Sequence, residues 1–371
     1  MTDPARDLLA HTVRREGARV LATLIRTVGD VQVAEDAVQE AVVAALTSWP
    51  RTGVPAEPRA WLTLTARRKA LDVLRRESGR SAREEEGLRM IELGRSDLPP
   101  EDVVRDDQLR LIFTCCHPTL APATRVALAL RTLCGLDVPT IATVLLGTEA
   151  ATAKRLTRAR QKIAAARIPY RVPDVADLPD RLPAVCAVIQ ALYTAGYRPS
   201  SEDPVVRTEA VRLAELLHDL LPAQTMPQGL LALLLLTEAR RPARLDDRGE
   251  PVPLDRQDRN RWDRPMIDRG IDLLNRSLLA TQGSADPYQL QAAIAAEHDR
   301  AVSADATDHA EILRLYDLLV AVAPSEPARL ARAVAVAEVH GSAAGLAALD
   351  ELPPGGRRDE VRADLLERNR G

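Results

Sequence analysis

Two adjacent cysteines followed by a histidine lie in the stretch LIFTCCHPTLAP at residues 111–122. Such residues could bind zinc, or a cysteine and a histidine could act as a nucleophile and its base. Adjacent helical side chains point about 100° apart, and no second cysteine pair stands at metal-finger spacing, so a tetrahedral site would need the distant Cys134 and Cys186. We interpret Cys115 and Cys116 as small packed side chains at a tight corner. We therefore expect no metal, no cofactor and no catalytic residue.

The composition favours an all-α protein. Of 371 residues, 46% are hydrophobic and only 2% are aromatic, which leaves few β-branched and aromatic runs at period two. The longest apolar run, LLALLLL at 230–236, is far shorter than the roughly 20 residues that span a bilayer. The start MTDPARDLLA lacks the basic and apolar regions of a secretory signal. These features predict a cytoplasmic protein without membrane contact.

Charge divides the first half of the chain into two basic domains and an acidic linker. Residues 51–80 hold eight basic side chains against three acidic ones, and residues 150–171 hold seven against none. Between them, residues 81–107 hold nine acids and four arginines, with glycines and prolines that break secondary structure. We therefore predict domains at 1–80 and 108–171, a linker at 81–107, and a further domain at 172–371.

The first domain is predicted to contain three helices. One ends at Gly29, and the next, in AEDAVQEAVVAAL, carries Asp36, Gln39 and Glu40 at i, i+3 and i+4 opposite its apolar side. The third, about 59–77, has a polar arc formed by Trp61, Thr65, Arg68, Lys69, Asp72, Arg75 and Arg76. A tryptophan among cations suits stacking on unpaired bases; the alternative is that it caps the edge of the core.

The second domain is predicted to contain four short helices. Pro118 ends the first, Pro122 begins the second, and Asp137 caps the third, which Gly147 ends. Thr148 caps the last, whose outward side chains are Ala151, Lys154, Arg155, Arg158 and Lys162. A helix, a short glycine-containing turn and a basic helix are typical of a helix-turn-helix, which places its second helix in the major groove. The alternative is a solvated basic face on an ordinary helix.

Two such domains joined by an acidic linker resemble a sigma factor of the sigma-70 family, of the extracytoplasmic-function type. VAEDAVQEAVVAAL is similar to the segment that binds the β′ clamp helices of RNA polymerase, which implies contacts by Asp36, Gln39 and Glu40. RAWLTLTARRKALDVLRRE is similar to the helix that melts and reads the minus-ten element, which implies Trp61, Arg67, Arg68, Lys69, Asp72, Arg75 and Arg76. GLDVPTIATVLLGTEAATAKRLTRARQKI is similar to the minus-thirty-five reader, which implies Thr148, Glu149, Ala151, Lys154, Arg155 and Arg158. The resemblance also implies the β flap as a partner.

The remaining residues are predicted to form helical hairpins, because apolar residues recur at helical spacing from Leu182 to Ala337. Segments such as ALYTAGY and DPYQLQAAIAAEH resemble a sigma-factor subgroup with a tetratricopeptide-like extension, which implies a regulatory domain that could bind a protein partner. Residues 240–264 surround Trp262 with eight arginines and six acids. We weigh a solvated loop there against an arm that packs on the sigma domains or polymerase.

The function predicted from these features is promoter recognition together with core polymerase, with control by the C-terminal domain and no enzymatic activity. The competing hypothesis is a helix-turn-helix regulator with a repeat-type partner domain, which would bind duplex DNA without polymerase. An enzyme hidden in the tail is a third hypothesis. Only four histidines without ligand spacing support it there, namely His218, His298, His309 and His340.

Overall fold

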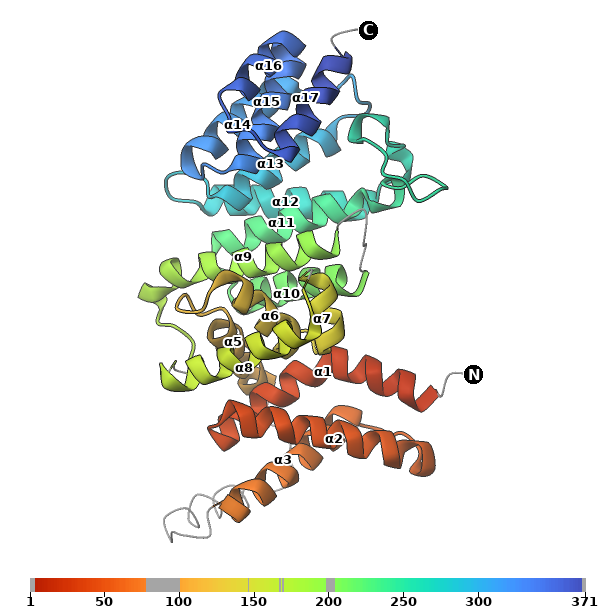
Figure 1. Ribbon diagram of the computed structural model, residues 1–371, viewed down its shortest axis with the longest axis vertical. Helices are drawn as coiled ribbons and strands as arrows, with labels where there is room; N and C mark the ends of the chain where they lie inside the picture. Colours follow the sequence, from red (N-terminus) through yellow and green to blue (C-terminus); the bar gives the residue numbers. More distant parts are fainter. Residues whose placement is uncertain are drawn as a thin grey trace. The chain divides into compact units, whose positions relative to one another are not determined.

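The protein is all-helical, as its composition predicts. A computed structural model describes residues 4–77, 101–145, 147–166, 168, 170–197 and 204–368, and within these ranges it contains helices and loops but no β-strand. The contacts divide the chain into two compact units, Met1–Ala210 and Val211–Gly371, and Figure 1 shows the helices of each. None of the helices in the described ranges has the length and apolar character needed to cross a membrane.

The first three helices, α1 (Pro4–Val28), α2 (Val31–Thr52) and α3 (Pro58–Glu77), pack on one another. Gly29 ends α1 with a positive φ of 79°, and the Asp30 carboxylate then caps α2 by accepting from the Val33 amide. The buried side of α2 is a stripe of small residues that lets its neighbours approach closely, namely Ala34, Ala37, Ala41 and Ala45. The predicted end at Gly29 is confirmed, and so is the burial of Ala34, Ala37 and Ala41 on the predicted apolar side of α2, whereas Leu46, which the sequence also assigns to that side, is exposed.

Four shorter helices follow: α5 (Glu101–Cys115), α6 (Pro122–Thr132), α7 (Val138–Val144) and α8 (Glu149–Ala165). The Asp137 carboxylate accepts from the Thr140 amide and caps α7, and the Thr148 hydroxyl accepts from the Ala151 amide at the start of α8. Both predicted caps are therefore confirmed. Because α5 already begins at Glu101, the C-terminal end of the predicted linker 81–107 is helical; its residues 81–100 lie outside the described ranges.

The structure joins the two predicted sigma-like domains in one packed unit. Arg26 of α1 donates from Nε to Oδ2 of Asp107 over 2.8 Å, and the Asp107 side chain is fully buried. The Tyr170 hydroxyl lies 3.0 Å from the carbonyl oxygens of both Ala22 and Asp107. Asp107, which the sequence places in the linker, is thus a buried partner that ties α5 to α1.

The helix α9 (Leu178–Gly196) also belongs to the first unit, although the sequence predicts the C-terminal domain to begin at residue 172. Arg181 donates from Nη2 to the Phe113 carbonyl oxygen over 3.2 Å, and Cys186 of α9 is fully buried. The division at residue 210 falls inside α10 (Pro204–Leu220). The tail therefore contributes a helix to the packing of the first unit.

The second unit is a series of antiparallel helical hairpins, as the apolar spacing predicts (Figure 1). Gly270 is required where two of its helices meet, because a Cβ there would lie 2.8 Å from Cγ of Leu236. Each helix packs on the next along the chain. They are α11 (Thr225–Ala239), α12 (Arg264–Ala280), α13 (Pro287–Arg300), α14 (His309–Val322), α15 (Glu326–His340), α16 (Ser342–Asp350) and α17 (Gly356–Arg368).

The arginine-rich segment 240–264 is anchored on the second unit by the buried residues Ala243, Arg259 and Trp262, while most of its other residues, 246–251 among them, are exposed as in a solvated loop. Trp262 is only 3% exposed, and the guanidinium carbons of Arg259 and Arg240 lie 4.7 and 5.7 Å from its ring centroid. Arg259 also donates from Nη1 to the carbonyl oxygen of Ala301 over 2.8 Å, just beyond α13. The tryptophan and arginines that could have anchored an external arm therefore hold α11 and α13 together.

Candidate nucleic-acid interface

The predicted outward face of α8 is accessible and basic. Thr148, Glu149, Ala151, Lys154 and Arg158 are exposed and Arg155 is half-buried. The opposite side packs in the core through Thr152, Leu156, Ala159 and Ile163, as the sequence predicts. The predicted helix-turn-helix therefore presents the positive side chains of α8 away from the core.

A hollow of about 390 Å³ lies between this face and the start of α6. Lys154, Arg155 and Arg158 line one side, and Leu120 and Thr124 line the other. Cations beside a helix N-terminus suit an anion such as a backbone phosphate, while side chains on the exposed face can reach base edges. Sequence reasoning missed Thr124, because its position beside α8 depends on how α6 packs.

The second predicted surface lies along α3. Arg67 and Lys69 are half-buried and Arg68 and Asp72 are exposed, while Arg75 and Arg76 belong to the last turns of the helix and their side chains lie outside the description. The opposite arc is buried through Leu62, Ala66, Ala70 and Leu71. The structure therefore exposes Arg68 and Asp72 on this helix, whereas Arg67 and Lys69 are only partly accessible.

Trp61 has an aromatic partner that the sequence did not identify. It is half-buried, and its ring lies edge-to-face with that of Trp49, with 5.6 Å between the centroids and 70° between the planes. Trp49 is only 2% exposed. An edge-to-face pair holds both rings in defined orientations, so Trp61 is fixed at the border between the core and the surface of α3.

The predicted polymerase-binding side chains Asp36, Gln39 and Glu40 are exposed on α2. Glu40 forms an exposed ion pair with Lys69 of α3, with 3.3 Å between Oε2 and Nζ. The predicted polymerase surface on α2 and the predicted DNA surface on α3 therefore adjoin at this ion pair. An exposed pair contributes at most about 1 kcal/mol to stability, so both side chains can exchange their partners at little cost.

An apolar hollow of about 330 Å³ lies next to these side chains and includes Gln39. Val38 and Val43 of α2 contribute to its wall, and Val43 is 61% exposed. Leu46, one helical turn further along α2, is 41% exposed. Sequence reasoning assigned Leu46 to the apolar side of the helix. The candidate polymerase surface thus combines polar side chains with exposed apolar ones, the mixture typical of protein interfaces.

The cysteines occupy packed positions. Cys115, Cys116, Cys134 and Cys186 are free and buried. Burial raises the pKa of the Cys116 thiol to about 12 and also raises that of Cys115. Both shifts oppose the thiolate that a metal or a nucleophilic reaction needs. Over the ranges that the structure describes, no three histidine, cysteine or acidic residues gather in a way that could hold a metal ion.

Comparisons with known proteins match three families along the chain. "Sigma-70 region 2" matches residues 12–80, "Sigma-70, region 4" matches residues 110–163, and "Family of unknown function (DUF6596)" matches residues 181–278. The first two matches cover α1–α3 and α5–α8, the helices that carry the candidate surfaces. No solved structure matches the chain.

Among curated proteins, the chain is 40% identical over 343 residues to "Uncharacterized protein R00370" of Rhizobium meliloti (strain 1021), covering 90% of this chain and 80% of that protein. It is 35% identical over 166 residues to "Probable ECF RNA polymerase sigma factor SigI" of Mycobacterium tuberculosis (strain ATCC 25618 / H37Rv). That match covers 44% of this chain and 56% of the relative. The helices described above thus match regions 2 and 4 of the sigma-70 family, each over its own part of the chain.

Proposed function

We propose that this protein is a sigma factor of the sigma-70 family, which initiates transcription by binding core RNA polymerase through α2, opening the minus-ten element with α3 and holding the minus-thirty-five element with α8. The observation that carries the proposal is the position of the two family matches, which coincide with the helices bearing the exposed candidate surfaces. Sigma factors act by binding rather than by catalysis, so the proposal needs no enzymatic site.

The polymerase contact is proposed to involve Asp36, Gln39 and Glu40 with the β′ clamp helices, and α5–α8 with the β flap. The exposure of all three α2 side chains supports this assignment. The neighbouring residues Val43 and Leu46 supply exposed apolar surface, whose removal from water would favour binding. Charged groups around such an apolar surface steer the encounter of the two proteins and fix the register in which they bind.

The promoter contacts are proposed to divide between melting and reading. Around α3, the ring of Trp61 and nearby cations such as Arg68 suit single-stranded DNA. Proteins bind single strands mainly by stacking aromatic rings on the bases and neutralising the phosphates. On α8, Lys154, Arg155 and Arg158 suit a duplex groove, where phosphate contacts position the helix and base contacts specify the sequence.

The C-terminal hairpins are proposed to regulate initiation in cis. Their residues 211–371 form a compact unit of their own, and hairpin arrays present extended surfaces to partners. Binding of this unit to polymerase would raise the effective concentration of the sigma domains, whereas binding to their DNA-reading faces would block promoters. We favour assistance over inhibition.

Run-off transcription from a genomic library, with core polymerase alone and with core polymerase plus this protein, tests the proposed function. We expect new start sites that depend on the protein, with unpaired thymines around the minus-ten position detected by permanganate. A regulator of the helix-turn-helix type would instead protect duplex DNA without polymerase and would create no start sites on core enzyme. That second outcome would reject the proposal.

A further inference from the structure

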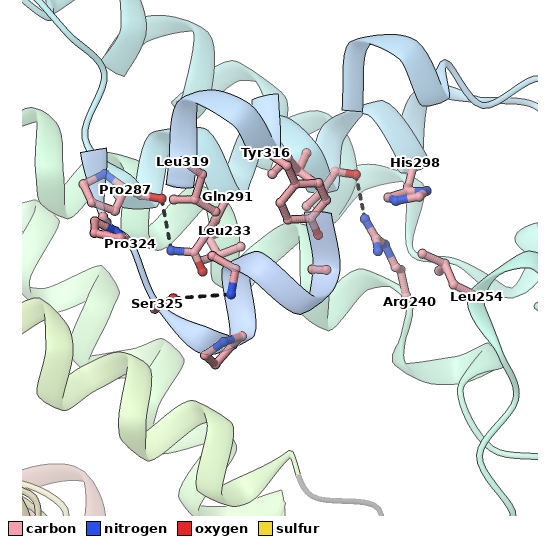
Figure 2. Close-up of a pocket in the computed structure, with 16 residues that line it drawn as sticks. Leu233, Arg240, Leu254, Pro287, Gln291, His298, Tyr316, Leu319, Pro324 and Ser325 are labelled. Carbon is pink, nitrogen blue, oxygen red and sulfur yellow. Dashed lines mark hydrogen bonds between the residues drawn. The ribbon is translucent and has the colours of Figure 1, made fainter. Parts of the chain in front are cut away.

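A cavity in the second unit has the size and lining of a small-molecule site. Its volume is about 540 Å³, and it lies among α13, α14 and α15 beside the end of α11 (Figure 2). Apolar side chains form most of its wall, among them Leu233, Ile294, Leu319 and Ala328. Protein cavities that hold small ligands measure about 300–1,000 Å³ and are largely apolar with a few placed polar groups.

Arg240 is the charged group at one end of this cavity, next to His298 (Figure 2). Its Nε donates to Oδ1 of Asp299 and its Nη2 to the Ala295 carbonyl oxygen, each over 2.6 Å. Its guanidinium also lies over the ring of Trp262. Nη1 has no hydrogen-bond partner among the described residues. The guanidinium is thus held in one orientation with three of its five N–H bonds still available, two of them on Nη1.

The surroundings of Arg240 have an excess of positive charge. Burial raises the pKa of Asp299, and the charges of Arg240, Arg259 and Arg264 oppose that shift. Burial, followed by the charge of Arg240, lowers the pKa of His298 to about 3, so its imidazole is neutral at pH 7. Three guanidinium groups therefore lie around one carboxylate. An anionic group at this end of the cavity would reduce the imbalance.

Tyr316 supplies a second available donor on the wall of the cavity. It is half-buried, burial raises the pKa of its phenol, and its hydroxyl forms no hydrogen bond to any residue in the described ranges. In Figure 2 it lies between Arg240 and the prolines at the other end. At that other end the Gln291 amide already donates to the Pro287 carbonyl oxygen over 3.0 Å. The charged group of the cavity therefore lies at the Arg240 end, and the Gln291 amide at the other end already has a hydrogen-bond partner.

We propose that this cavity binds a small carboxylate with an apolar body. The carboxylate accepts hydrogen bonds from Nη1 of Arg240 and from the Tyr316 hydroxyl, and the body packs against Leu233, Ile294 and Leu319. Neither the promoter contacts nor regulation in cis is needed for this binding. The site can therefore be tested in the isolated full-length protein.

Isothermal titration of the full-length protein uses octanoate as the probe, with 1-octanol as the same body without the charge and acetate as the charged head without the body. We expect saturable 1:1 binding of octanoate, binding of 1-octanol weaker by about tenfold or more since a charge-assisted hydrogen bond is lost, and no measurable binding of acetate. Equal affinity for octanoate and 1-octanol would overturn the anionic-head assignment, and no saturable octanoate binding would overturn the site.

Two variants and a control locate the binding. Ala331→Phe adds a ring to the wall of the cavity and should abolish octanoate binding, whereas Ala321→Phe, at an exposed position of α14 outside the cavity, should leave it unchanged. Tyr316→Phe removes only the hydroxyl and should weaken binding about fivefold to tenfold. It keeps the test decisive even where Ala331→Phe does not fold. Unchanged affinity in Tyr316→Phe, or in a folded Ala331→Phe protein, would show that octanoate binds elsewhere.

Discussion

Arg160 of α8 forms an ion pair with Glu35 of α2, with 2.5 Å between Nη2 and Oε2. The Thr132 hydroxyl lies 3.3 Å from the other oxygen of the same carboxylate, and Glu35 is only 6% exposed. A single buried carboxylate thus connects region 2 to two helices of region 4. Glu35 directly precedes Asp36 in the chain, so the proposed polymerase surface borders the junction between the two regions.

The first prediction concerns this junction. Arg160→Ala leaves Glu35 buried without its cation, which should destabilise the contact by about 3 kcal/mol. Glu35→Ala combined with Arg160→Ala should recover part of that loss, because no unpaired charge remains. Hydrogen exchange of α2 and α6 amides should report both effects. Equal protection in the wild type and the Arg160→Ala variant would show that the pair contributes nothing to the packing of the two regions.

The second prediction concerns polymerase binding. Replacing Asp36, Gln39 and Glu40 together with alanine should weaken the affinity for core polymerase by about tenfold or more, with little effect on folding because all three are exposed. Fluorescence titration with labelled core enzyme measures the affinity. Gln32→Ala, at another exposed position of α2, is the matched control. If the triple variant binds core enzyme as the control does, α2 is not the contact surface.

The third prediction concerns the basic face of α8. Lys154→Ala and Arg155→Ala should each weaken minus-thirty-five binding by about 1–3 kcal/mol where a base contact is lost, and should reduce the salt slope by about 1 where a phosphate contact is lost. Footprinting of the holoenzyme across a range of salt concentrations separates the two cases. Gln161→Ala, exposed on the same helix, should leave both quantities unchanged. Wild-type footprints from both cationic variants would reject the α8 assignment.

The fourth prediction concerns the C-terminal unit. Truncation after Tyr197 keeps α9, whose Arg181 and Cys186 pack in the first unit, whereas truncation after Arg171 would also expose that core. We expect run-off transcription to fall by roughly tenfold or more at low polymerase concentration, because effective concentration is lost. A rise would indicate that the tail inhibits. Full-length rates at every polymerase concentration would show that the tail plays no part in initiation.

The fifth prediction concerns pH. The pKa of His298 falls from its ordinary 6.5 to about 3 in the folded protein, so between these values the unfolded state binds more protons than the folded state. The second unit should therefore lose stability as the pH falls below 6.5, by about 2 kcal/mol at pH 5. Hydrogen exchange of α13 amides at pH 7 and pH 5, corrected for intrinsic rates, measures the loss. His298→Asn should reduce this pH dependence; an equal loss in both proteins would assign it to other groups.

Local features of the sequence were enough to predict the helices and many of their ends. Asp137, Thr148 and Gly29 act within one turn of their own position, and the apolar spacing of α2 and α8 reflects the helical period alone. The inward and outward sides of α8 follow from the same period, and so does the exposure of Asp36, Gln39 and Glu40. These predictions needed no knowledge of which helices touch.

Contacts between distant segments could not be predicted in this way. The sequence assigns Asp107 to an acidic linker and leaves Trp262 between a loop and an arm, yet the structure buries Asp107 against Arg26 of α1 and Trp262 beneath Arg240 at the end of α11. The partners of Glu35 and the cavity beside Arg240 also depend on residues far apart in the chain. Helical periodicity specifies which side of a helix is buried, but only the packing of the whole unit decides what covers that side, because many pairings bury a similar apolar area.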